Sequence, residues 1–123
     1  MTLSVAPPGW PREVRAPDAP EWERTAVAWL LDQCPPEYRS YPAVRGEPRV
    51  LARFAVLHVE AAQDGVHRAL SQARAGLRGH VEPAAVDAAV EAWLSEDARL
   101  AGVRRAAGLV EEALRGRRFA PRL

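Results

Sequence analysis

Two pairs of residue types in this sequence have the chemistry of catalytic or metal sites. The first is Asp64 and His67, whose carboxylate-x-x-His spacing is the one that di-metal helical bundles use to hold their ions. On a helical wheel both side chains lie away from the apolar stripe, and the sequence contains no second motif of this kind. We therefore interpret them as part of a solvated helix face and predict neither a bound metal nor a cofactor.

The second pair is His58 and Glu96. His58 lies on an apolar face between Phe54 and Ala61, where it could act as a general base or a pH switch, or be a hydrogen-bonded core histidine. Glu96 interrupts an apolar stripe; unpaired, it would have a raised pKa and be a catalytic candidate, whereas an ion pair with Arg68 would make it structural. We favour the structural interpretation of both, and keep an enzyme or small-ligand binder as an alternative.

The single cysteine, Cys34, excludes an internal disulfide and a multi-cysteine zinc site. It is expected at the C-terminus of a helix, where the negative end of the dipole disfavours a thiolate, so we predict a packed thiol. All 17 basic residues are arginine, which excludes Schiff-base chemistry and a phosphate-loop lysine. The sequence therefore predicts no catalytic residue.

Positive charge gathers at the C-terminal end. From Val103 onward there are six arginines and two acidic residues, although the net charge of the chain is only +1 and gives no overall footprint for nucleic acid. Guanidinium groups offer planar donors for phosphate or carboxylate, and aromatic residues add apolar anchors. The alternative is a solvated helix end with a short tail. The candidate interaction residues are Trp10, Arg115, Arg117, Arg118, Phe119 and Arg122.

Several elements must position these residues. Residues 1–17 are rich in proline, which predicts an extended arm that either lies over its own domain or reaches a partner. Asp18 and Glu21 have the spacing of a capping box, which predicts a first helix from there to about Gln33. Residues 35–48 contain four more prolines and are expected to form one or two short helical turns.

Two long helices follow, at about 48–78 and 83–114, separated by a break at Gly79 and ended by a glycine cap at Gly116. Each would be about 45 Å long and unstable alone, so they are expected to pack as an antiparallel hairpin. Opposite charges face each other in one register. The expected pairs are Arg78–Asp87, Arg74–Glu91, Arg68–Glu96, Glu60–Arg105, and Arg53 with Glu111 or Glu112.

The middle helix carries two apolar stripes, one over 51–61 and one over 62–77. This predicts that its first half packs on both the first and the last helix. Its second half is expected to pack on the last helix alone or on a second copy of the chain. Because exposed apolar stripes mark interfaces, we predict a homodimer.

The chain is therefore predicted to be a single all-α domain over 1–123. It comprises an extended arm (1–17), a helical body (18–116) in which a short first helix packs on a long antiparallel helical hairpin, and a basic tail (117–123). No apolar run approaches the roughly 20 residues of a membrane span, and the start has no signal-peptide features, so we expect a cytoplasmic protein without a membrane partner.

Residues 108–123, 8–12 and 28–36 resemble the corresponding parts of small actinobacterial proteins to which no function is assigned. The absence of lysine, asparagine and isoleucine is typical of a GC-rich genome. The resemblance extends over most of the chain and implies no activity.

These observations predict a non-enzymatic interaction or regulatory module that binds an unidentified protein through the C-terminus, the arm or both. An RNA- or ribosome-associated accessory protein is the alternative. Removal of the tail after Gly116 is expected to leave stability unchanged and abolish partner binding. If Phe119 and Leu123 instead fold back onto the bundle, its removal should destabilise the protein.

Overall fold

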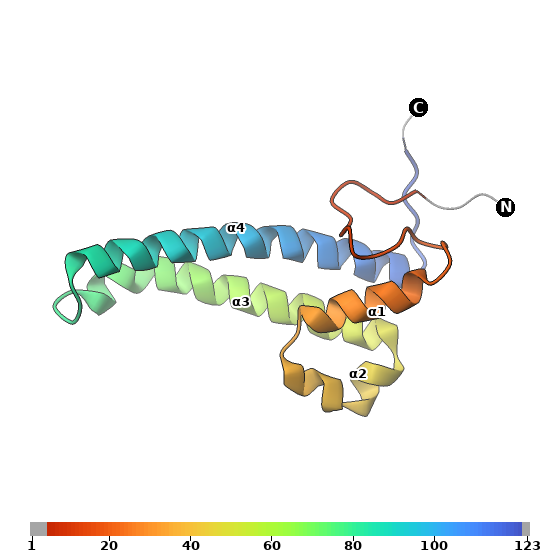
Figure 1. Cartoon of the computed structure of the whole chain (residues 1–123), viewed down its shortest axis with the longest axis horizontal. Helices are drawn as coiled ribbons and strands as arrows, with labels where there is room; N and C mark the ends of the chain where they lie inside the picture. Colours follow the sequence, from red (N-terminus) through yellow and green to blue (C-terminus); the bar gives the residue numbers. More distant parts are fainter. Residues whose placement is uncertain (1–4, 122–123) are drawn as a thin grey trace.

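Two long antiparallel helices form the body of the molecule, as predicted. The computed structural model describes residues 5–121; α3 (Pro48–Leu77) and α4 (Pro83–Leu114) run along its whole length (Figure 1). Each begins with proline, whose missing N–H has no helical acceptor at that position. Gly79 adopts a positive φ of 80° in the turn between them, which glycine does without strain.

Three shorter elements pack at one end of this hairpin. They are α1 (Trp22–Asp32), a 3-10 turn η1 (Pro36–Ser40) and α2 (Pro42–Gly46). The short turns expected between residues 35 and 48 are thus confirmed, and so is the all-helical class, since residues 5–121 contain helices and no strand. None of these helices is long and apolar enough to cross a membrane.

The main core lies where α1 meets the hairpin. Its largest fully buried side chains are Leu30 of α1, Val44 of α2, Leu51 of α3 and Val110 of α4. A smaller cluster, built on α3 and α4 alone, continues toward the far turn. The first half of α3 therefore packs on both α1 and α4, as predicted, and also on α2. The far half of the hairpin extends beyond α1 (Figure 1).

The predicted start of the first helix is wrong. Helix α1 begins at Trp22, and its N-cap residue, Glu21, makes no side-chain capping hydrogen bond. Asp18 and Glu21 both have positive φ angles, 71° and 67°, which place them in tight turns before the helix. The capping-box geometry requires an extended backbone at the cap, so the left-handed conformation removes it.

The segment before α1 lies on the bundle. Residues 5–21 comprise the described part of the predicted arm and the turns that follow it, and we call this whole segment the arm. Turn hydrogen bonds bend it repeatedly, such as Trp10 N–H to the Pro7 carbonyl and Val14 N–H to the Pro11 carbonyl. Val14 is 4% exposed and belongs to the main core, and Trp10 packs against that core. Of the two roles predicted for the arm, the structure shows the one in which it covers its own domain.

The charge register of the hairpin is confirmed by Arg53, whose Nε lies 3.1 Å from Glu111 Oε2. The other expected pairs are replaced by contacts with a residue one position or one helical turn away, or by a pair within one helix, because long side chains can reach several partners. The observed pairs are Arg74–Asp87 in place of Arg74–Glu91 and Arg78–Asp87, Arg104–Glu60 in place of Arg105–Glu60, and Arg99–Glu96 in place of Arg68–Glu96.

Helix α4 ends at a glycine cap, as predicted. Gly116 has a φ of 97°, its N–H donates to the Ala113 carbonyl, and the Arg117 N–H donates to the Glu112 carbonyl. This pair of hydrogen bonds is the Schellman motif. It turns the chain after the helix, so that the tail, residues 117–121, continues beside the arm.

Candidate protein-interaction surface

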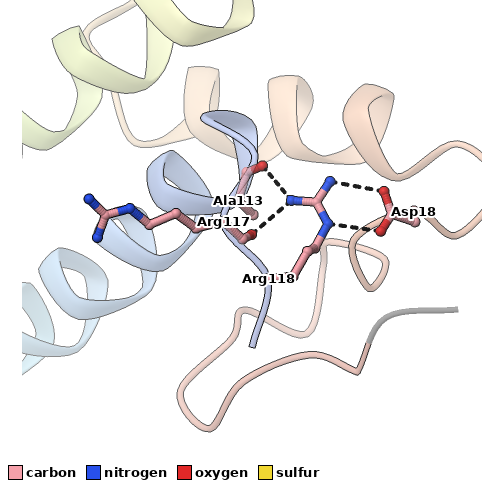
Figure 2. Close-up of polar contacts among 4 residues, drawn as sticks. All are labelled: Asp18, Ala113, Arg117 and Arg118. Carbon is pink, nitrogen blue, oxygen red and sulfur yellow. Dashed lines mark hydrogen bonds and ion pairs between the residues drawn. The ribbon is translucent and has the colours of Figure 1, made fainter. Parts of the chain in front are cut away.

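Arg118 joins the tail to the arm (Figure 2). Its Nε and Nη2 donate to the two carboxylate oxygens of Asp18 at 2.8 and 2.9 Å. Its Nη1 donates to the backbone carbonyls of Ala113 and Arg117, both at 2.8 Å. Four of the five guanidinium donors are therefore used inside the molecule. The bonded Asp18 carboxylate raises the pKa of Arg118.

Aromatic contacts extend this junction into α1. The Arg118 guanidinium lies 5.5 Å from the centre of the Trp22 ring, within cation–π range. The Trp22 ring is 6.5 Å from that of Trp10, and the Trp10 indole N–H donates to the Val14 carbonyl at 2.9 Å. The arm, α1 and the tail therefore form one packed junction. Its two linked residues, Asp18 and Arg118, are 100 residues apart in the sequence.

A groove of about 230 Å³ lies beside this junction. We call the residues that line this groove the arm–tail surface. Phe119 on its tail side is 40% exposed. The arm–tail surface consists of Pro7, Trp10, Pro17, Leu109, Glu112, Ala113, Arg117, Arg118 and Phe119.

Arg117 is the accessible charge of this surface. Its Nη1 lies 2.8 Å from Glu112 Oε2, but 78% of its side chain remains exposed. Arg115, in contrast, pairs with Glu111 at 3.5 Å and does not line the groove. Arg122 lies outside the described residues. The structure thus brings together Trp10, Arg117, Arg118 and Phe119 from the residues predicted to interact.

The sequence did not identify Asp18 as the partner of Arg118, nor Leu109 as part of the groove. Asp18 was assigned to a helix cap, a role that residues of its type often take. Leu109 belongs to neither buried cluster, so no core position marked it. One signal was available: a proline-rich arm with a carboxylate and a tryptophan has the groups that an arginine tail would bind.

The alternative site at His58 and Glu96 has less support. The ring of His58 is half-buried, 5.9 Å from that of Tyr38, and borders a cavity of about 150 Å³. Ligand pockets are commonly about 300–1,000 Å³. Glu96 pairs with Arg99, which lowers the pKa of Glu96, the reverse of the shift expected for an unpaired seam carboxylate.

The remaining candidates have structural partners. His67 Nε2 lies 2.7 Å from Asp97 Oδ1, and Asp64 is not part of that contact. Within residues 5–121, no three His, Cys, Asp or Glu side chains are grouped to hold a metal ion. The Cys34 thiol donates to the Leu30 carbonyl at 3.3 Å, and burial raises the pKa of Cys34, which disfavours the nucleophilic thiolate.

Asp97 should make the hairpin sensitive to acid. Hydrogen bonds from Gln63 and His67 lower the pKa of Asp97 below its unfolded value. Its stabilising contribution is therefore present above the unfolded pKa, about 4, and is lost as pH falls through the folded pKa. We expect Asp97→Asn to lose less stability than the native chain over that interval, measured by urea unfolding across pH. The exposed Asp64→Asn control should follow the native chain; equal acid sensitivity in all three would contradict the prediction.

The chain matches no family model, and comparison with curated proteins and with solved structures found no similar protein.

Proposed function

We propose that this protein is a non-enzymatic interaction module that binds a partner protein at the arm–tail surface. One observation carries the proposal: Phe119 and the guanidinium of Arg117 stand exposed at an apolar groove whose two sides are held together by Arg118 and Asp18. Surfaces that are ordered before binding lose less conformational entropy when a partner arrives.

The chemistry of the surface specifies the kind of partner segment. The groove between Trp10 and Phe119 accepts an apolar side chain. The exposed side chain of Arg117 offers parallel donors to a carboxylate. The segment that fits is therefore a short peptide with a large apolar residue next to aspartate or glutamate.

An RNA partner is the second candidate, and the same residues support it less well. A single carboxylate needs only the donors that Arg117 keeps exposed, whereas an RNA chain presents successive phosphates. Each described arginine from Arg115 onward is paired with an acidic side chain, so the surface has little net positive charge to hold them. These pairs are Arg115–Glu111, Arg117–Glu112 and Arg118–Asp18.

A peptide-display selection on the full chain tests the proposal. We expect enrichment of peptides that combine a large apolar residue with neighbouring carboxylates. Because both contacts would be lost, Arg117→Glu with Phe119→Ala should weaken binding of the enriched peptides by at least about 100-fold. Isothermal titration of one enriched peptide measures this effect.

Leu57→Ala is the matched control, because Leu57 is 53% exposed and lies on α3 outside the arm–tail surface. It should bind the peptides as the native chain does. Selection of no peptide class, or of peptides that bind the double variant equally well, would contradict the proposal. Tight, strongly salt-dependent binding of a single-stranded RNA oligomer that is lost in the double variant would favour the second candidate.

A further inference from the structure

One face of the hairpin carries a regular series of cross-helix charge contacts. On α3 the participating residues recur every seventh position, which keeps them on one side of the helix. Their partners on α4 descend in the opposite order along the same seam. We call this side the ladder face. Its contacts are Arg53–Glu111, Glu60–Arg104, His67–Asp97 and Arg74–Asp87.

The ladder face has no cover within the described chain. Near α1 it forms an open groove of about 660 Å³, to which residues 5–121 contribute lining residues from α3 and α4 alone. Helix α1 packs on the other side of the hairpin, where Asp32 and Gln33 border a cavity together with His58 and Arg99. The arm–tail surface adjoins the ladder face along α4, because Leu109 and Glu112 line both grooves.

Large apolar side chains occupy this face between the two charge contacts nearest the turn, His67–Asp97 and Arg74–Asp87. Leu70 follows His67 by three residues and precedes Arg74 by four, so it lies on the same side of α3. On α4, Val90 and Leu94 fall between Asp87 and Asp97. Leu94 is 55% exposed, and Leu70 and Val90 are half-buried. Apolar side chains bordered by charged residues are a common feature of protein interfaces.

We propose that the ladder face binds a second copy of this chain, with the two hairpins parallel and related by a two-fold axis along their length. This axis lays α3 of one copy over α4 of the other at the same level. Arg74 then faces the partner's Asp87, and Glu60 faces the partner's Arg104. Because the two members of each of these ion pairs carry opposite charges, the face is complementary to itself in this arrangement.

The antiparallel arrangement lacks this complementarity. In this arrangement the two-fold axis is perpendicular to the hairpin and passes through the level of Leu70. Helix α3 of one copy then lies over α3 of the other, with the opposite chain direction. Asp97 would then approach the partner's Asp87, and His67 would approach the partner's Arg74. Like charges across an interface oppose association, so the charge pattern selects the parallel dimer.

Sedimentation equilibrium of the full chain tests the dimer. We expect a concentration-dependent dimer whose dissociation constant rises at least about tenfold in Leu94→Glu, because each interface would then bury two unpaired carboxylates. Tyr41→Glu is the matched control: Tyr41 is 47% exposed, lies at the start of α2 and should leave the dimer unchanged. Circular dichroism checks that both variants are folded.

Spin labels at Arg49→Cys, with Cys34→Ala to remove the native thiol, test the orientation. Arg49 lies about 30 Å from Leu70 along α3 at 1.5 Å per residue. The parallel dimer therefore places the two labels within about 30 Å, and the antiparallel dimer roughly 60 Å apart. A monomer at all concentrations, a dimer insensitive to Leu94→Glu, or labels at the longer distance would overturn the proposal.

Discussion

Alanine in place of Trp22 should lower the free energy of unfolding by about 3–5 kcal/mol. The Trp22 side chain is 8% exposed and belongs to the main core. Its ring also contacts Trp10 of the arm and lies under the Arg118 guanidinium. The variant therefore loses core packing and the contacts that unite arm, α1 and tail. Urea unfolding followed by circular dichroism measures the loss.

Native-state proteolysis separates these two consequences. Arg12 and Arg15 lie in the arm, and trypsin cuts after arginine where the backbone is free to open. We expect rapid cleavage at these sites in Trp22→Ala. The control Trp93→Ala affects the smaller cluster on α3 and α4. It should destabilise the chain while leaving the arm protected; equal arm protection in both variants would show that Trp22 does not hold the arm.

A chain that ends at Gly116 should lose about 1–3 kcal/mol of unfolding free energy, which replaces the expectation from sequence that the tail is dispensable for stability. Truncation removes the paired Arg118 and its contact with Trp22. The Arg118–Asp18 pair is half-exposed and contributes little more than about 1 kcal/mol; the cation–π contact adds a similar amount. Thermal unfolding should shift down by several degrees.

A second chain, ending at Phe119, keeps these contacts and is the matched control. It should melt with the full-length protein. If the chain ending at Gly116 also melts with the full-length protein, the Arg118–Asp18 link is not stabilising. If both truncated chains melt early, the stabilising residues lie beyond Phe119.

The helical body could be predicted because its signals are local. Proline at positions 48 and 83 marks the starts of the long helices, and Gly79 and Gly116 mark the turn and the end. The buried residues of α1, which are Trp22, Ala26, Trp29 and Leu30, recur at helical spacing. These features depend on neighbours within a few residues, so they can be predicted from the sequence alone.

The candidate site could be predicted only in part, because its contacts are not local. Arg118 reaches Asp18 across 100 residues, and no periodic pattern relates them. The positive φ of Asp18 also follows from the path of the arm over the bundle, which overrides its preference for a helix cap. The cross-helix ion pairs were also predictable only in part. The positions of opposite charges along the two helices predicted their register, but the individual partners depend on how far each side chain reaches.

The indole N–H signals of the four tryptophans give the most direct test of the arm–tail surface. In a nitrogen–proton NMR titration of the full chain with one selected acidic–apolar peptide, the Trp10 signal should shift, because its ring lines the groove. The Trp93 signal should stay in place, because that residue packs in the distant cluster of α3 and α4. Saturable binding that shifts Trp93 and leaves Trp10 unmoved would contradict the account.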